Sequence, residues 1–85
     1  MRIGMGYDIH RFKEGRLLIL GGILIPNTQG LEGHSDADAL THAVCDSLLG
    51  AMNEGDLGRY YPSSDPEFKD MDSLEMLKGV GEKLA

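Results

Sequence analysis

The residues best suited to chemistry in this sequence are its histidines and the carboxylates spaced around them. Asp8 and His10 stand two positions apart. If this stretch is a strand, both side chains leave the same face, which is a spacing that metal ligands use. Gly4 and Gly6 share that face and would let another group approach the backbone. The alternative is a polar pair on the surface of an edge strand.

A second set of acidic and histidine residues recurs every four positions. Its members are His34, Asp38, His42 and Asp46. In a helix that begins near Asp36, the last three share one face, and such a stripe can simply face solvent. A histidine with an acid one turn away on either side is also well placed as a metal ligand or an acid–base group. Asp38 or Asp46 could then orient the second ring nitrogen of His42.

Together, Asp8, His10 and His42 would supply two imidazoles and one carboxylate. Three protein ligands with an open position are the pattern of catalytic zinc sites, whereas structural sites are closed. We therefore expect one zinc ion per chain if the fold brings His42 to the Asp8–His10 pair.

The elements that must position these residues follow from the periodicity. Residues 2–10 alternate, with Ile3, Met5, Tyr7 and Ile9 on one face, which predicts a half-buried strand. Two apolar runs, residues 17–20 and 23–25, flank a Gly-Gly pair and predict a β-hairpin. Residues 27–33 have the composition of a loop.

Two helices are expected after the hairpin. The first begins with a capping box formed by Ser35 and Asp38 and ends near residues 52–54. Its expected core stripe is Leu40, Val44, Leu48 and Ala51. The second begins at a capping signal in residues 72–75 and carries the stripe Leu74, Leu77, Val80 and Leu84. Gly79 and Gly81 cost this helix about 1 kcal/mol each, so it needs a packing partner.

Between the helices, residues 56–58 read as a turn and residues 60–66 as an irregular loop. Cys45 lies in the middle of the expected helix beside Val44 and has no basic neighbour in sequence, which favours a buried structural thiol over a nucleophile. Gly4-Met5-Gly6 lacks the third glycine of a dinucleotide-binding fingerprint, so that interpretation is rejected.

The composition excludes several classes of protein. The 85 residues are 41% hydrophobic and 26% charged, as in ordinary globular domains, and the single cysteine excludes an internal disulfide. We expect no signal peptide and no membrane span. Residues 1–31 hold four bases and two acids, whereas residues 32–85 hold four bases and twelve acids. The net charge of −6 argues against nucleic-acid binding and suits carboxylates gathered around a cation.

Several segments, taken in order, resemble one enzyme family. They are Gly6-Tyr7-Asp8-Ile9-His10, Gly21-Gly22 with Ile25-Pro26, Gly33-His34-Ser35-Asp36-Ala37-Asp38, Leu40-Thr41-His42-Ala43, Asp46-Ser47-Leu48-Leu49-Gly50, Gly55-Asp56-Leu57-Gly58 and Tyr61-Pro62-Ser63-Ser64-Asp65-Pro66. From Met1 to about Ser73 the chain is similar to the 2-C-methyl-D-erythritol 2,4-cyclodiphosphate synthases of the non-mevalonate isoprenoid pathway.

The resemblance implies a reaction and a site. A phosphorus–oxygen lyase of this family closes a cytidine diphosphate ester into a cyclic diphosphate and releases CMP. By similarity, Asp8, His10 and His42 hold zinc at the substrate diphosphate, and His34 is catalytic. The implied substrate contacts are Asp8, His10, His34, Ser35, Asp56, Leu57, Gly58, Tyr61, Pro62, Ser63, Ser64 and Asp65. Met5, Ser63, Gly79 and Gly81 depart from the family's usual pattern.

The resemblance also implies an architecture. The expected class is α+β, with a β-hairpin-rich sheet, helices packed on one face and a place in a trimeric synthase fold. Residues 1–85 form a single domain that corresponds to the N-terminal part of a larger one. In the complete enzyme, active sites lie between the subunits of a homotrimer and a second divalent ion, Mg²⁺ or Mn²⁺, is present. The implied compartment is the bacterial cytoplasm.

Two other interpretations stay open at this stage. The chain alone could be a catalytically inactive, metal-binding fragment of that enzyme, in which case it releases no CMP. It could also be an unrelated small α/β interaction module, in which case it binds no divalent metal.

Overall fold

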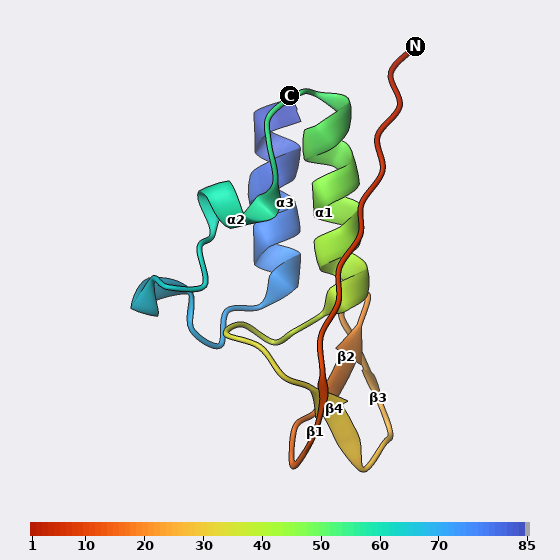
Figure 1. Cartoon of the computed structure of the whole chain (residues 1–85), viewed down its shortest axis with the longest axis vertical. Coiled ribbons are helices and arrows are strands. Elements are labelled where there is room, and N and C mark those ends of the chain that lie inside the picture. Colours follow the sequence, from red (N-terminus) through yellow and green to blue (C-terminus); the bar gives the residue numbers. More distant parts are fainter. Residues whose placement is uncertain (85) are drawn as a thin grey trace.

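Two helices lying side by side carry the larger part of the fold (Figure 1). They are α1 (Ala39–Ala51) and α3 (Ser73–Leu84), and the computed structural model describes residues 1–84. The other elements are β1 (Phe12–Glu14), β2 (Leu18–Leu20), β3 (Ile23–Ile25), β4 (Gln29–Leu31), the short helix α2 (Leu57–Tyr60) and the 3-10 helix η1 (Pro66–Phe68). This combination of antiparallel strands and helices confirms the expected α+β class.

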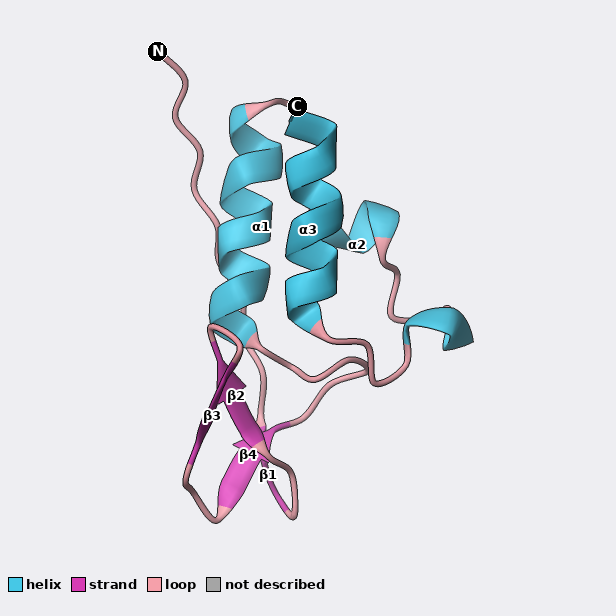
Figure 2. Ribbon diagram, turned by 180° about the vertical axis from the view of Figure 1, so that it is seen from behind, coloured by secondary structure: helices cyan, strands magenta, loops and turns pink. Residues whose placement is uncertain are grey.

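The strands gather at one end of the helix pair (Figure 2). β2 pairs with β3 and β1 pairs with β4, both antiparallel. The predicted hairpin is confirmed, and its two turn glycines have φ of 63° and 76°, the positive values that a two-residue hairpin turn favours. The prediction that residues 27–33 are loop is wrong over β4, because β1 offers this segment a strand edge to pair with.

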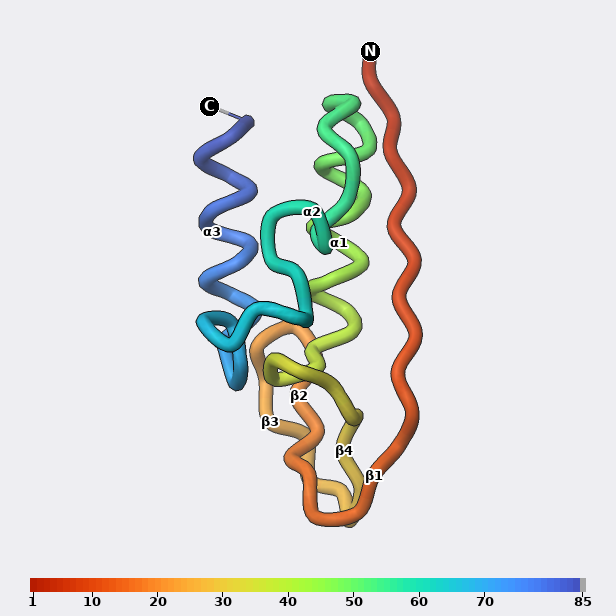
Figure 3. Tube along the Cα trace, turned by 60° about the vertical axis from the view of Figure 1, so that its left-hand side comes forward, coloured from red at the N-terminus to blue at the C-terminus, as the bar shows by residue number. Residues whose placement is uncertain are grey.

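Residues 1–11 form an extended N-terminal arm that runs along α1 (Figure 3). The prediction of a sheet strand here is wrong, since no ladder pairs these residues within the described chain. The alternation itself holds, but the apolar face, including Ile9 at 75% exposed, points away from the fold. Gly4 and Gly6 turn inward, where a Cβ would collide with the α1 backbone carbonyls of Ser47 and Ala43.

Helix α1 begins at Ala39, three residues later than the start at Asp36 that the capping box predicted. Ala37 adopts φ of 55°, which is incompatible with a helix, so Asp38 becomes the cap. Its carboxylate accepts the Thr41 N–H at 3.0 Å and the N–H groups of the hairpin-turn glycines at 2.8 and 2.7 Å. Burial raises the pKa of Asp38, but these hydrogen bonds outweigh it and lower the pKa. One buried carboxylate thus joins the hairpin to α1.

The core lies between α1 and α3, and the stripe predicted for α1 is displaced by one position. The buried residues of this helix are Thr41, Cys45 and Leu49, whereas Leu40 is 54% exposed. The expectation that Cys45 is structural is confirmed, and burial, reinforced by nearby Asp46 and Asp38, raises the pKa of its thiol to about 11. The side of the helix that is apolar in sequence is therefore not the side that α3 covers.

Helix α3 runs through both of its glycines, as predicted, but the core stripe predicted for it is wrong. Its buried residues are Ser73, Met76 and Val80, so Val80 alone of the predicted set is fully buried, and Leu74 is 42% exposed. The packing on α1 provides the support that the helix needs. Gly79 lies under the Tyr61 hydroxyl, where a Cβ would collide, whereas a Cβ at Gly81 would meet open space.

The segment between α1 and α3 wraps around the side of the helix pair (Figure 1). Asp56 accepts the Arg59 N–H at 3.1 Å and caps α2, so the turn predicted at residues 56–58 is the start of a short helix. The irregular loop predicted at residues 60–66 is present over residues 61–65, because Tyr60 ends α2 and Pro66 begins η1. Among residues 1–84, no helix has the length and apolar character that crossing a bilayer requires.

Candidate metal centre and its pocket

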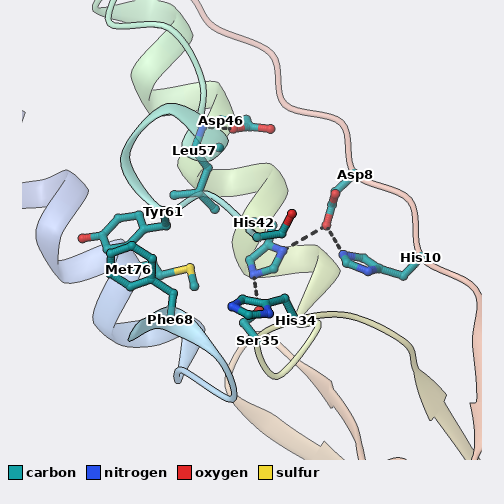
Figure 4. A pocket seen from close by; sticks show the side chains of 12 residues that line it. Asp8, His10, His34, Ser35, His42, Asp46, Leu57, Tyr61, Phe68 and Met76 are labelled. Atoms are coloured by element: carbon teal, nitrogen blue, oxygen red, sulfur yellow. Dashed lines mark hydrogen bonds and ion pairs between the residues drawn. The ribbon is translucent and has the colours of Figure 1, made fainter. Parts of the chain in front are cut away.

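A pocket of about 240 Å³ opens where the N-terminal arm, α1, α2 and the start of α3 approach one another (Figure 4). It is lined by Asp8, His10, His34, Ser35, His42, Asp46, Leu57, Gly58, Tyr61, Ser63, Phe68 and Met76. Polar and metal-ligating groups are on one side, and aromatic and aliphatic side chains are on the other.

Asp8, His10 and His42 converge at the polar side of this pocket, as the sequence predicted. Oδ2 of Asp8 lies 2.8 Å from Nε2 of His10 and 3.2 Å from Nδ1 of His42, and Figure 4 shows the carboxylate between the two rings. All three ligand atoms lie within 4.8 Å of one another, and all three residues are half-buried. Two imidazole nitrogens and one carboxylate oxygen at this spacing fit a divalent metal ion with an open coordination position.

The triad depends on the close approach of the arm to α1. Because Gly6 has no side chain, the arm lies directly against the carbonyl of Ala43, next to His42. This contact places Asp8, two residues further along the arm, opposite the ring of His42. The glycines that the sequence offered for a close approach are therefore used to bring helix and arm together.

Each histidine of the triad has its second ring nitrogen occupied. Nδ1 of His10 lies 2.7 Å from the backbone carbonyl of Glu32, and Nε2 of His42 lies 2.7 Å from Oγ of Ser73. Such partners hold the rings of metal-binding histidines in place. The two rings present opposite nitrogens to Asp8, Nε2 from His10 and Nδ1 from His42.

The hypothesis that Asp38 or Asp46 orients His42 is wrong. Asp38 is committed to the α1 cap and the hairpin turn, and Oδ1 of Asp46 accepts the Leu57 N–H at 2.7 Å. Asp46 instead anchors the start of α2 and lines the pocket. Helical spacing placed these acids one turn from His42, but each had a nearer backbone donor to satisfy.

His34 and Ser35 lie on the same pocket wall as the triad. Nε2 of His34 is 2.7 Å from the carbonyl oxygen of Asp65, which connects this histidine to the loop before η1. Ser35 is buried, and its hydroxyl accepts the Ala37 N–H at 3.3 Å. Its backbone carbonyl receives a hydrogen bond from Arg16 at 2.8 Å. Both side chains are thus held in place beside the candidate ligands.

The helix terminus expected beside Ser35 is absent, because α1 begins only at Ala39. The Ala37 and Asp38 N–H groups are taken by the side chains of Ser35 and Asp36, and the Asp38 carboxylate fills the helix cap. The N-terminus of α1 is therefore not free to bind an anion at this wall.

The other expected substrate contacts divide into two sets. Leu57, Gly58, Tyr61 and Ser63 line the pocket. Asp56, Pro62, Ser64 and Asp65 lie outside its lining, with Asp56 exposed as the cap of α2 and Asp65 capping η1 through the Glu67 N–H at 3.0 Å. Of the second set, Asp65 still contacts the site through its carbonyl oxygen on His34.

Sequence reasoning missed the apolar wall of the pocket and the polar support behind His42. Phe68 and Met76 line the wall, and Phe68 packs edge-on against Tyr61 with ring centroids 5.2 Å apart. Ser73 and Asp36 supply the support. Periodicity marked Ser73 only as part of a helix start, so nothing in the sequence connected it to a histidine 31 positions earlier.

An α+β fold that carries a half-buried cluster of two histidines and one carboxylate in an open pocket defines the class of this protein: a domain with a candidate divalent-metal centre. Comparison with known proteins gives the family. A family model described as the YgbB family matches residues 1–85, and the chain belongs to that family.

Relatives of established name agree. The 2-C-methyl-D-erythritol 2,4-cyclodiphosphate synthase of Chlorobium phaeovibrioides is 61% identical over 84 residues, which are 99% of this chain and 54% of the relative. Two solved structures of 2C-methyl-D-erythritol-2,4-cyclodiphosphate synthase, one a CDP-bound form, superpose with TM-scores of 0.89 and 0.88. Both are 43% identical to this chain and match 98% of it and 55% of the solved chain. The chain spans about half the length of the curated relatives it matches.

Proposed function

We propose that this chain supplies the metal-binding half of a cyclodiphosphate synthase active site. The complete enzyme converts 4-diphosphocytidyl-2-C-methyl-D-erythritol 2-phosphate into 2-C-methyl-D-erythritol 2,4-cyclodiphosphate and CMP. A 2-phosphate oxygen bonds to the β-phosphorus, and the bond from that phosphorus to the oxygen bridging to the α-phosphate breaks. The observation that carries the proposal is the Asp8–His10–His42 triad in one pocket with His34 and Ser35, in a member of the YgbB family.

The site's donor set suits zinc and a phosphate substrate. Asp8, His10 and His42 would hold the ion, which when bound supplies Lewis-acid stabilisation and a template for the phosphate oxygens. Ser35 stands next to that position and can donate a hydrogen bond to charge that develops on the phosphoryl oxygens. The Nε2 hydrogen of His34 is directed to the Asp65 carbonyl, so His34 donates to the phosphate from Nδ1 when its ring is protonated. Phosphoryl transfer asks a protein mainly for positioning and electrostatic stabilisation, and this wall offers both.

The methylerythritol part of the substrate is assigned to the other wall. Leu57 and Gly58 line the pocket at the start of α2, and Asp56 stands beside them as a carboxylate that can accept hydroxyl hydrogen bonds. In the loop from Tyr61 to Asp65, Tyr61 and Ser63 line the pocket, and Pro62, Ser64 and Asp65 are assigned as further contacts of the same part of the substrate. The apolar ring of Phe68 suits a carbon skeleton better than a phosphate.

The proposal extends to the complete enzyme. It is a homotrimer with active sites between its subunits, it carries a second divalent ion, Mg²⁺ or Mn²⁺, and it acts in the bacterial cytoplasm on a small-molecule substrate. The net charge of −6 supports the exclusion of a nucleic-acid partner. The CDP-bound form of the similar solved synthase supports a cytidine diphosphate ligand.

The test is CMP release from the cytidine diphosphate substrate by the full-length protein that contains these residues. We expect zinc-dependent turnover, and His34→Ala should lower turnover far more than it lowers zinc binding, because His34 is outside the triad. Equal loss of both would make His34 a ligand or a structural residue. Absence of CMP release by a folded, zinc-loaded protein would refute the proposed reaction.

The 85-residue chain alone should release no appreciable CMP. It should still bind zinc, because all three ligand candidates lie before Cys45. This is the outcome that the inactive-fragment alternative also predicts, so the full-length protein decides between the two. Release of CMP by the purified 85-residue chain, with a longer species excluded by mass spectrometry, would contradict this expectation.

A further inference from the structure

The ring of His42 is held by a hydroxyl group that belongs to another helix. Nδ1 of His42 faces Asp8, and Nε2 lies 2.7 Å from Oγ of Ser73, the first residue of α3. Ser73 is fully buried, so no bulk water competes for this bond. The hydroxyl of Ser35 lies 3.4 Å from the same nitrogen, and the shorter contact identifies Ser73 as the principal partner.

Asp36 determines which way the Ser73 hydroxyl points. The Asp36 carboxylate accepts the Ser73 backbone N–H at 2.9 Å and the Ser73 O–H in a short hydrogen bond. A carboxylate accepts only, so the single hydroxyl hydrogen of Ser73 is directed to Asp36. The Ser73 oxygen then has only lone pairs left for His42, and Nε2 of His42 must be the donor. That tautomer leaves the Nδ1 lone pair free on the side of Asp8.

The other histidine of the triad is held differently. Nδ1 of His10 meets the backbone carbonyl of Glu32, an acceptor that any residue at that position provides. The orientation of His42 depends instead on two particular side chains, Ser73 and Asp36. The loop that carries Asp36 and the segment before α3 are also joined by a hydrogen bond from the Asp36 N–H to the Met71 carbonyl at 3.2 Å.

We propose that Ser73, with Asp36 behind it, is a positioning residue of the metal centre. It selects the His42 tautomer that presents Nδ1 to the ion and fixes the direction of that ring. It also connects the ion to α3, an element that contributes no ligand of its own to the triad. This inference rests on the metal site assigned under the proposed function.

The test compares metal binding by the full-length wild-type protein and three variants of it. Ser73→Ala removes the acceptor of the Nε2 hydrogen, and we expect zinc affinity to fall about 10- to 100-fold, as for loss of other outer hydrogen-bond partners. Asp36→Asn should lower affinity less, because the amide oxygen can still accept one of the two Ser73 donors. The matched control is Ser47→Ala. The Ser47 hydroxyl donates to the Val44 carbonyl within α1 at 2.7 Å, away from the triad, so the zinc affinity of this variant should equal that of the wild type.

Two readouts separate positioning from general destabilisation. In ¹⁵N spectra the zinc-bound wild type should show a metal-bound Nδ1 and a protonated Nε2 at His42, and the Co²⁺ absorption spectrum should change in Ser73→Ala. The circular dichroism of the metal-free variant should match that of the wild type. If Ser73→Ala does not fold, Asp36→Asn decides the question, with Ser73→Thr as the variant that restores the hydroxyl.

The possible failures are distinguishable. A wild type that binds neither zinc nor Co²⁺ overturns the metal site itself, and this inference with it. A wild type that binds zinc, together with a Ser73→Ala variant of unchanged affinity and unchanged His42 spectra, overturns the positioning role alone. If Ser73→Ala cannot be prepared, an Asp36→Asn variant with unchanged zinc affinity and unchanged His42 spectra also overturns the positioning role.

Discussion

The helix pair and the N-terminal arm bury opposite kinds of residue. Each has a regular pattern that separates two faces. The α1–α3 pair buries apolar side chains, with Leu49 and Val80 at 0% exposed. The arm turns its glycines, Asp8 and His10 inward and leaves its apolar side chains exposed, Ile3 at 91%.

The difference shows what holds each region in place. Hydrophobic burial between α1 and α3 holds the helix pair, while Leu40, Val44 and Leu74 on the outer sides of these helices stay exposed. The arm is held by close backbone approach, by the His10 bond to the Glu32 carbonyl and by the Asp8 contact with His42. A metal ion at the triad would add coordination bonds between the arm and α1. Metal binding and the position of the arm should therefore depend on each other.

The largest effect should come from a change in the helix-pair core. Leu49→Ala creates a cavity at a fully buried position and should lower the free energy of unfolding by about 2–5 kcal/mol. Ile9→Ala removes a similar side chain from an exposed position on the arm and should change it by less than about 0.5 kcal/mol. Urea unfolding of both variants of this chain measures the contrast, and equal costs would contradict the comparison.

A substitution on the arm should damage metal binding while it spares the core. The Cβ of Gly6→Ala collides with the Ala43 carbonyl and forces the arm away from α1, which separates Asp8 from His42. We expect zinc affinity to fall by at least about 100-fold, more than loss of an outer partner causes. Calorimetric titration measures this.

The control for Gly6→Ala is Gly81→Ala, which adds the same methyl group in open space on α3. Its zinc affinity should equal that of the wild type. A Gly6→Ala variant that binds zinc normally would show that the arm tolerates displacement and that the triad does not depend on the glycine contact.

The Asp38 carboxylate, which joins the β2–β3 hairpin to α1, should stabilise the fold in a pH-dependent way. Asp38→Ala removes an acceptor of Gly21, Gly22 and Thr41 N–H bonds and should cost about 2 kcal/mol near neutral pH. The pKa of Asp38 is lowered on folding, so its stabilisation is complete above the ordinary value of 3.8 and disappears as the pH falls through the lower folded-state value. Stability measured against pH should therefore fall more steeply in acid for the wild type than for Asp38→Ala, and parallel curves would contradict the role.

The smallest expected effect is an increase in stability. Gly81→Ala replaces a glycine inside α3 where nothing obstructs the new methyl group, and it should raise the free energy of unfolding by up to about 1 kcal/mol. Gly79→Ala should give no such gain, because its Cβ meets the Tyr61 hydroxyl. Thermal melting of the two variants distinguishes them, and an equal gain in both would show that Tyr61 moves aside freely.

Local signals predicted much of the fold. The Gly-Gly hairpin and α3 followed from turn chemistry and periodicity, which act over a few residues. The buried faces of α1 and α3 did not follow from periodicity. The choice between Leu40 and Cys45 on α1, like the choice between Leu74 and Met76 on α3, depends on how the two helices pack on each other. The strand β4 and the unpaired arm likewise depended on which distant edge was available.

The candidate site likewise has a part that could be predicted from the sequence and a part that could not. Spacing indicated the Asp8–His10 pair, and the resemblance to the synthase family implied that His42 joins it, which agrees with the cluster in the structure. The support behind them was not predictable. The Ser73 contact with His42 spans 31 positions and has no sequence pattern, and the assignment of Asp38 or Asp46 failed because helical spacing shows proximity without showing competing partners.

The most direct test of the central claim is the zinc stoichiometry of the wild type and two histidine variants, measured by calorimetric titration and elemental analysis. We predict one zinc ion per chain in the wild type, a sharp loss in His42→Ala, and retention in His34→Ala, which removes a histidine from the same pocket but not from the triad. Unchanged stoichiometry in His42→Ala, or equal loss in both variants, would contradict the assignment of Asp8, His10 and His42 as the metal centre.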